Sequence, residues 1–181
     1  MSERSSLAVL GLGSNLPERE RWLDLAIQVI RAGPATVVAA TPRWNTIPRG
    51  APPQPDYLNQ LVLVRGRRDG PGWLELAQQA ERAAGRRRRV DKGPRTLDVD
   101  VVLVEDVSSS VPWLRLPHPA LLERPHLLAG AAALVPRWKL PGETLPLGEL
   151  ARRRLTGSWR RPVPIRGEAG PPGRGWPSGS P

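Results

Sequence analysis

Cysteine and phenylalanine are absent from this 181-residue chain, and tyrosine and methionine occur once each. Without cysteine there can be no disulfide, no thiolate metal site and no thiol nucleophile. No stretch reaches the ~18 consecutive apolar residues of a membrane span. The polar residues 1–6 and the short apolar run after them do not resemble a signal peptide. We therefore expect a cytoplasmic protein that does not bind a membrane.

Acidic residues are scarce as well, since 17 Asp and Glu stand against 27 Lys and Arg, a net charge of +10. Such an excess favours anionic partners, either nucleic acid or nucleotide phosphates, and charge alone does not separate the two. Arginines form runs at 86–89 and 152–154 and recur after residue 157. For the second run and for the residues after 157, solvated surface is the simpler interpretation.

The length allows one domain with a substantial core but not two large ones. We place this domain at residues 1–156. Residues 157–181 are rich in Gly, Pro, Ser and Arg, contain two tryptophans and show no apolar period. We expect them to form a disordered tail.

The most informative stretch is Gly93–Glu105, which predicts a strand with two acids on one face. Side chains two apart on a strand point to the same side, so Asp98 and Asp100 are expected to be neighbours. Their face continues as Val102 and Val104. The opposite face is apolar throughout, with Leu97, Val99, Val101 and Leu103. The strand therefore leads from a cleft into the core.

Two carboxylates ~7 Å apart on a half-buried face repel each other unless a positive charge lies between them. Mg²⁺ meets this need, because one or two carboxylates commonly hold it while water and phosphate oxygens complete its shell. Arg95, three residues before the first acid, suits a polyphosphate beside such a metal. The alternative is a solvated edge strand that happens to carry two acids.

The remaining patterns predict the element order β-α-β-β-α-β. The expected elements are strands at 7–12, 36–41 and 57–64, a helix whose apolar face runs from Trp22 to Ile30, and a helix at 71–84. Asn15 and Glu18 resemble a capping box for the first helix, and Gly85 is expected to end the second. The proline-rich segment 46–55 predicts an irregular loop, either a lid or a connector.

Three further groups of side chains are candidates for binding. Tyr57 and Asn59 could stack on and hydrogen-bond a flat heterocycle, although a tyrosine at the core edge is an equal alternative. The basic loop 86–92 could clamp phosphates. His118 and His126 fall within nine positions of each other and are either functional or structural. Because the chain has neither a GxGxxG motif nor a P-loop, it would bind ATP without them.

Taken together, these stretches resemble the 6-hydroxymethyl-7,8-dihydropterin pyrophosphokinase family of folate biosynthesis, from about Leu7 to Leu150. The most specific element is Pro-Arg-Thr-Leu-Asp-Val-Asp at 94–100. The others follow in the same chain order: Gly11-Leu-Gly-Ser-Asn15, Thr46–Gly50, Gln54–Asn59, Glu81 with Gly85-Arg86, and Leu116-Pro-His-Pro119 with Glu123-Arg124.

The resemblance implies a ferredoxin-like α+β fold and an ATP-dependent diphosphotransferase that pyrophosphorylates the hydroxymethyl oxygen of the pterin and releases AMP. We expect a monomer that binds ATP and the pterin, and no nucleic acid. By position, Asp98 and Asp100 resemble the ligands of two Mg²⁺ ions. The catalytic arginines match Arg86, Arg88 and Arg95. The family's ATP contacts match Leu74, Gln78, His118 and Arg124. The pterin pocket matches Thr46, Tyr57, Asn59 and His126.

Three positions depart from the family pattern. His126 stands where a phenylalanine commonly stacks on the pterin, Lys92 where a tryptophan is frequent, and Arg49 where an apolar residue is usual. These departures leave open a catalytically impaired member of the family. The alternative from another class is a basic nucleic-acid-binding module. It leaves Asp98 and Asp100 unexplained, because acids repel a phosphate backbone.

Overall fold

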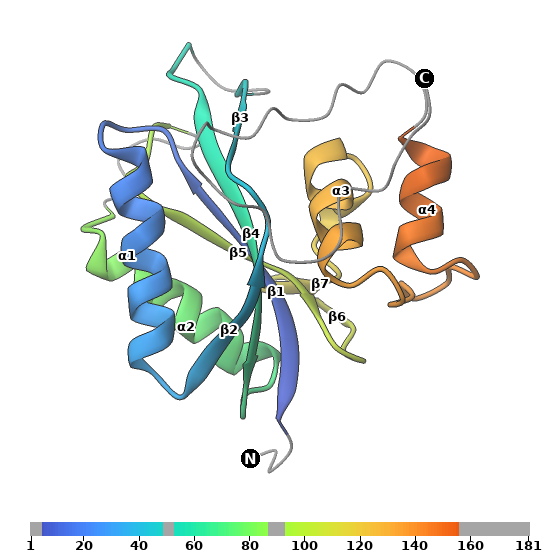
Figure 1. Cartoon of the computed structure of the whole chain (residues 1–181). Helices are drawn as coiled ribbons and strands as arrows, with labels where there is room; N and C mark the ends of the chain where they lie inside the picture. Colours follow the sequence, from blue (N-terminus) through green and yellow to red (C-terminus); the bar gives the residue numbers. More distant parts are fainter. Residues whose placement is uncertain (1–4, 49–52, 87–92, 156–181) are drawn as a thin grey trace.

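A five-stranded antiparallel sheet forms the centre of the computed structural model, which describes residues 5–48, 53–86 and 93–155 (Figure 1). Its strands are β1 (Ser6–Ser14), β2 (Ala35–Ala40), β3 (Trp44–Thr46), β4 (Tyr57–Gly66) and β5 (Asp98–Val104). Their order is β2-β4-β1-β5, and β3 pairs with β4. Strand β1 therefore lies between the strand with the two acids and the strand with Tyr57 and Asn59.

Helices cover both faces of the sheet (Figure 1). On one side are α1 (Arg19–Ala32) and α2 (Gly70–Ala83), and on the other are α3 (Pro125–Leu134) and α4 (Leu147–Arg154). Between β5 and α3 the chain forms the hairpin β6 (Ser109–Val111) and β7 (Leu114–Leu116) and the 3₁₀ helix η1 (Pro119–Leu121). The α+β prediction is confirmed, and the predicted order corresponds to β1, α1, β2, β4, α2 and β5.

The alternation along β5 holds only as far as Val102. The register with β1 shifts between Leu10 and Val9, which pair with Val101 and Leu103 and leave Val102 as the extra residue of a bulge. As a result Val102 and Leu103 both pack on the α3 side, while Val104 packs on the α1 and α2 side. The prediction that Val104 follows the aspartate face and Leu103 the opposite face is therefore wrong.

The expected capping box at the start of α1 is also wrong. Glu18 is the N-cap, its backbone is left-handed with φ of 65°, and no side chain caps the helix there. The side chain of Asn15 instead makes contacts outside α1. At the end of α2 the prediction is confirmed, because Gly85 has a φ of 63°, which glycine adopts without a steric penalty.

The described part of the predicted loop 46–55 is irregular except at Thr46, which ends a short strand that the sequence did not indicate. Trp44, Asn45 and Thr46 form β3 and pair with Asn59, Leu58 and Tyr57. This short strand was missed because a three-residue strand gives no usable alternation. It brings Thr46 to the same end of β4 as Tyr57.

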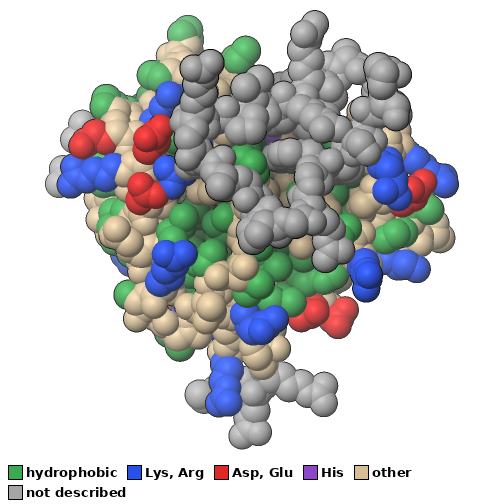
Figure 2. Space-filling view, viewed as in Figure 1, with side chains coloured by type: hydrophobic (Ala, Val, Ile, Leu, Met, Phe, Trp, Pro, Cys, Tyr) green, Lys and Arg blue, Asp and Glu red, His purple; other side chains and the backbone are tan. Residues whose placement is uncertain are grey.

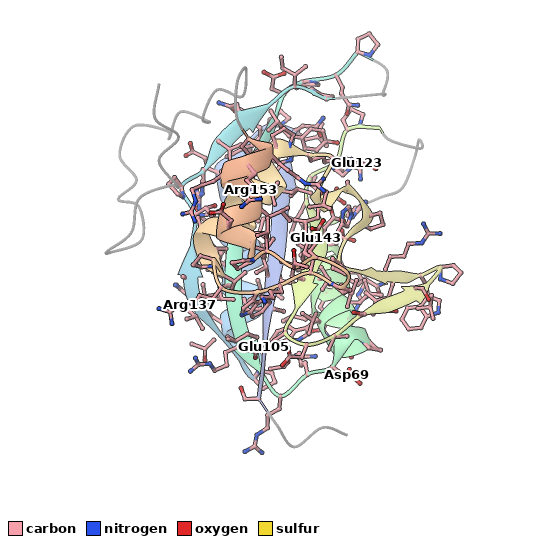
Figure 3. The ribbon with its side chains drawn as sticks, turned by 90° about the vertical axis from the view of Figure 1, so that its right-hand side faces the viewer. Asp69, Glu105, Glu123, Arg137, Glu143 and Arg153 are labelled. Carbon is pink, nitrogen blue, oxygen red and sulfur yellow. The ribbon has the colours of Figure 1, made fainter. Side chains whose placement is uncertain are left out.

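The second arginine run forms surface ion pairs on α4. Arg152 and Arg153 both pair with Glu149, at 2.6 and 2.9 Å, and Arg154 pairs with Glu143 at 3.3 Å. Figure 3 labels Arg153 on α4 and Glu143 in the segment before it. This agrees with the interpretation as solvated surface. No helix in the described part of the chain is long and apolar enough to cross a membrane. The predicted tail at 157–181 lies outside the described residues.

Candidate active site

The two predicted acids lie at the start of β5, opposite two glycines of β1. Gly13 pairs with Asp98, and Gly11 pairs with Asp100. A Cβ added at Gly11 would come within 3.9 Å of the Asp100 Cβ, and one added at Gly13 within 4.0 Å of the Asp98 Cβ. A side chain at either glycine would be crowded on the face that carries the carboxylates, by Val102 at Gly11 and by Asn59 at Gly13, each at 3.3 Å.

Two arginines hold the Asp98 carboxylate. Arg86 reaches Oδ1 at 2.8 Å and Arg95 reaches Oδ2 at 3.2 Å. Arg86 also pairs with Glu81 of α2, whose Oε1 accepts the backbone N–H of Val99 at 2.9 Å. The side chains of Glu81 and Arg86 are each only 13% exposed, which makes this a rigid, largely desolvated cluster. The structure thus brings Arg86 and Arg95 together at one acid.

Asp100 lies in a different electrostatic environment. Burial raises the pKa of its carboxyl above the ordinary value, and the charge of Asp98 raises it further. His118, Arg124 and Arg86 act in the opposite direction, which places all three near this carboxyl. The predicted ATP contacts His118 and Arg124 are therefore close to the second acid.

The backbone of His118 is anchored to β5, because its N–H donates to the Val102 carbonyl at 2.8 Å. Its Nδ1 accepts the Ala120 N–H at 3.1 Å at the start of η1. This contact assigns the neutral ring's proton to Nε2, which becomes the donor available to a ligand. The side chain of Arg124, at the N-cap of α3, is exposed.

The predicted pterin residues gather on β3 and β4. Asn59 donates to the Thr46 hydroxyl at 2.8 Å, and Tyr57 is paired with Thr46 across the two strands. A Cβ on Gly13 would meet Asn59 Oδ1 at 3.3 Å and Tyr57 Cδ1 at 3.7 Å. Gly13 is therefore bordered by Asp98 on one side and by Tyr57 and Asn59 on the other.

The hydroxyl of Tyr57 stays protonated at neutral pH. Burial raises the pKa of the phenol, and the charge of Asp98 adds to the rise, although Arg95 and Arg86 partly oppose it. A hydrogen bond between Arg95 and the Tyr57 side chain also lowers this pKa. Arg95 thus links the pterin side of the site to Asp98.

His126 lies beside a tryptophan that the sequence interpretation missed. The rings of His126 and Trp44 are 6.4 Å apart at an angle of 54°. Trp44 is 1% exposed and sits on β3, two residues before Thr46. A tryptophan so close to a predicted pterin contact was the signal that could have identified it. One side of the His126 ring thus lies near the buried ring of Trp44.

Other predicted residues are less central. Leu74 is half-buried against the core and Gln78 is exposed on α2, one turn before Glu81. Arg88, and the departures at Lys92 and Arg49, fall outside the described residues. Among the described residues, no three acid or histidine side chains are placed to hold a metal ion by themselves. A metal held here by the two acids would need further ligand oxygens, from water or from a substrate.

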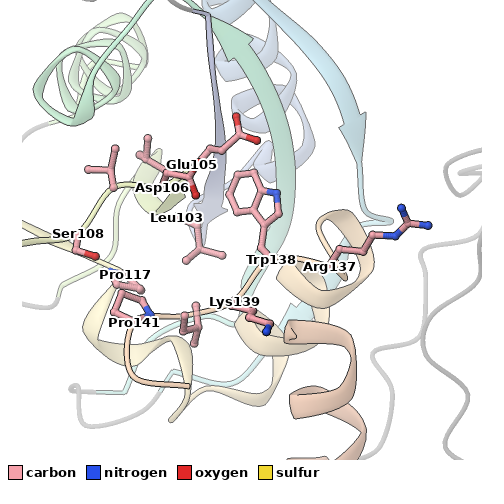
Figure 4. Close-up of a pocket in the computed structure, with 12 residues that line it drawn as sticks. Leu103, Glu105, Asp106, Ser108, Pro117, Arg137, Trp138, Lys139 and Pro141 are labelled. Atoms are coloured by element: carbon pink, nitrogen blue, oxygen red, sulfur yellow. The ribbon is translucent and has the colours of Figure 1, made fainter. Parts of the chain in front are cut away.

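A separate pocket of about 450 Å³ lies at the other end of β5 (Figure 4). It is lined by the last residues of β5 and the turn after them, by Pro117, and by 137–141. In Figure 4, Trp138 lies beside Glu105. Because the two aspartates are at the beginning of the strand, this pocket is not part of the candidate active site.

Comparison with known proteins identifies a family. Residues 9–136 match the model of the 7,8-dihydro-6-hydroxymethylpterin-pyrophosphokinase family. The 2-amino-4-hydroxy-6-hydroxymethyldihydropteridine pyrophosphokinase of Bacillus subtilis is 34% identical over 131 residues, covering 72% of this chain and 78% of that protein. The Methylorubrum extorquens protein of the same name is 35% identical, covering 76% and 88%. The Mycobacterium leprae protein of that name is 40% identical, covering 67% and 65%.

Solved structures share the fold at low sequence identity. The wild-type Plasmodium falciparum HPPK-DHPS structure with pteroate superposes with a TM-score of 0.66 at 11% identity and covers 86% of this chain. The wild-type structure with pterin and p-hydroxybenzoate gives 0.63 at 11% identity. This chain spans less than half of those chains, 44% and 43%.

Proposed function

The chain belongs to the 7,8-dihydro-6-hydroxymethylpterin-pyrophosphokinase family, and from this membership we propose its reaction. It transfers the pyrophosphoryl group of ATP to the hydroxymethyl oxygen of 6-hydroxymethyl-7,8-dihydropterin and releases AMP, as a step of folate biosynthesis. The observation that carries the proposal is the position of Asp98 and its two arginines beside Gly13, which borders Tyr57 and Asn59. A phosphate-binding cluster and a site for a flat heterocycle therefore adjoin.

The two substrates divide the site between them in this proposal. ATP lies over β5 and the start of α3, where His118 offers Nε2–H and Arg124 offers a guanidinium near Asp100. The pterin lies over β3 and β4, where Asn59 and Thr46 supply polar groups and Tyr57 supplies a ring. Its hydroxymethyl group then points across Gly13 toward the acids.

We propose that Asp98 and Asp100 hold Mg²⁺ together with the phosphate oxygens of ATP. Oxygen donors from one or two carboxylates fit this hard cation. The Asp98 carboxylate has about four lone-pair sites and can keep its arginines while it binds a cation. The raised pKa of Asp100 fits as well, because an adjacent cation favours the charged carboxylate there. When bound, the metal neutralises phosphate charge and orients the polyphosphate.

The chemistry requires positioning and charge stabilisation more than proton transfer. The pterin oxygen forms a bond to the β-phosphorus, the bond from that phosphorus to the bridging oxygen of AMP breaks, and the hydroxymethyl proton leaves to solvent. In the cluster around Asp98, Arg86 and Arg95 face the charge that develops on the transferred group. No described side chain stands out as a strong general base.

Two further proposals concern the whole molecule. We propose that the catalytic domain is residues 1–156 and that it acts as a monomer in the cytoplasm. A nucleic-acid-binding role is the weaker candidate. On the uncovered part of the face in Figure 2, basic side chains lie scattered among green, red and tan ones and do not form one stripe. Nucleic-acid binding usually requires a continuous basic surface.

The test is AMP release from ATP, measured with and without 6-hydroxymethyl-7,8-dihydropterin and with and without Mg²⁺. We expect AMP only when both are present. AMP formed without the pterin would indicate hydrolysis, and no AMP from folded protein would contradict the proposal. Binding of RNA with a steep salt dependence, in place of turnover, would favour the rival function.

A further inference from the structure

Asn15 is a buried polar residue whose side chain joins two separate segments of the site. It follows β1 directly and is 1% exposed. Its Nδ2 donates to Gln54 Oε1 at 2.8 Å and to the Pro55 carbonyl at 3.2 Å. Its Oδ1 accepts the backbone N–H of Arg95 at 2.8 Å, and its own backbone N–H donates to the Arg95 carbonyl at 3.3 Å.

The partners of Asn15 lie within a few residues of the two parts of the site, the phosphate-binding cluster at Asp98 and the pterin-binding residues that begin at Tyr57. Arg95 binds Asp98 through its side chain, so fixing its backbone fixes the direction of a guanidinium beside the acids. Pro55 lies two residues before Tyr57, at the entry to β4. A single amide therefore sets the distance between the phosphate-binding cluster and the ring that faces the pterin.

Packing alone does not account for an amide at this position. Burying an amide costs free energy unless its donors and acceptor are used, and here both donors and the acceptor are engaged. An apolar residue would fill the same space without holding either segment. The 54–56 segment is also held from its other side, because Arg19 donates to the Asp56 carbonyl at 2.8 Å and to Asn45 at 3.1 Å. Loss of the Asn15 contacts should therefore shift this segment without unfolding it.

We propose that Asn15 is a positioning residue that couples the pterin-binding segment 54–57 to Arg95. The proposal rests on the function given above. It assigns the alignment of the pterin-binding segment with the phosphate-binding cluster to the Asn15 side chain. Asn15 does not touch the reacting atoms in this account; it acts through Arg95 and Tyr57.

The test uses variants that remove the hydrogen bonds of the Asn15 Nδ2 group and leave the bond that its Oδ1 accepts from Arg95. Asn15→Asp keeps an oxygen for the Arg95 N–H but loses the donor to Gln54 and Pro55. Gln54→Met removes the accepting oxygen at similar size. Gln28→Met is the matched control, because Gln28 is exposed on α1, away from the site. Calorimetry measures the dissociation constants of the pterin and of a non-hydrolysable ATP analogue with Mg²⁺, and an AMP assay measures kcat.

We expect Gln54→Met to weaken pterin binding about 5- to 10-fold, as for one lost hydrogen bond, while the affinity for the ATP analogue stays within about twofold. Asn15→Asp should weaken pterin binding more and also lower kcat, because the pterin is no longer aligned with Arg95. The double variant should bind the pterin no worse than Asn15→Asp alone, since both changes break the same contact.

The proposal is overturned if Gln54→Met binds the pterin as tightly as Gln28→Met does, or if the two substitutions add in full. Should Asn15→Asp fail to fold, Gln54→Met and its control still decide. Failure of the proposed function looks different, because the unmodified protein would then release no AMP at all.

Discussion

Replacing Asp100 by asparagine should make the metal-free protein more stable and inactive at the same time. The folded protein disfavours the Asp100 charge, because burial and the charge of Asp98 both raise the pKa of this carboxyl. A raised pKa means that the ionised form costs folding free energy at pH values above it. Asparagine keeps the shape and removes the charge.

The size of this gain follows from the geometry of the strand. Two carboxylates ~7 Å apart repel by about 2 kcal/mol at an effective dielectric constant of about 20. Arg86 and Arg95 bind Asp98 and offset part of this repulsion. We therefore expect a net gain of about 1 kcal/mol, which raises Tm by about 2–4 °C in a chain of this size.

The assay is thermal unfolding in EDTA at several pH values. The advantage of Asp100→Asn should be full at pH 8 and should shrink as the pH falls through the raised pKa, because Asp100 of the unmodified protein is then protonated too. Asp106→Asn, in the exposed turn after β5, is the matched control and should leave Tm unchanged. Mg²⁺ with an ATP analogue should raise Tm of the unmodified protein but not of Asp100→Asn. Equal or lower stability of Asp100→Asn at pH 8 would refute the reasoning.

Three further substitutions test other parts of the site. Asp98→Ala should lower kcat roughly a thousandfold or more, because it removes a metal ligand and the carboxylate that pairs with Arg86 and Arg95; near-normal turnover in the AMP assay would contradict the assignment. Gly13→Ala should raise the dissociation constant of the pterin about 10-fold in calorimetry, since its Cβ would press on Asn59 Oδ1 at 3.3 Å; unchanged affinity would show that the pterin does not cross this glycine. His126→Phe should bind the pterin more tightly in calorimetry, because a phenyl ring stacks on a flat heterocycle more strongly than imidazole does; unchanged affinity would argue against stacking at this position.

Local sequence patterns predicted much of the fold. The predictions failed where contacts with residues distant in sequence determine the conformation. The apolar run around Asp98 and Asp100 identified β5, because alternation is a property of the strand itself. The bulge at Val102 was not predictable, since it depends on the register with β1. Asn15 illustrates the same limit at the site, because its sequence spacing to Glu18 suggested a helix cap while its partners lie about 40 and 80 residues away.

The sequence indicated individual residues of the candidate site but not the contacts between them. The resemblance pointed to Arg86, Arg95 and the two acids together, and the structure places them in one cluster. It did not indicate that Glu81 would bridge an arginine and a backbone N–H of β5. Nor did it indicate that Trp44 lies beside His126, because β3 is too short to produce an alternating apolar pattern.

The position of β5 at the edge of the sheet has a consequence for association between molecules. An edge strand presents free backbone groups to which a strand of another chain can pair. Here the Glu81 side chain takes the Val99 N–H and the His118 N–H takes the Val102 carbonyl, so residues of the proposed active site also cover the open side of the strand. A Glu81 variant would therefore lose more than its hold on Arg86. Such a variant would expose backbone groups at the open edge of β5, so the solubility of the protein should fall together with its activity.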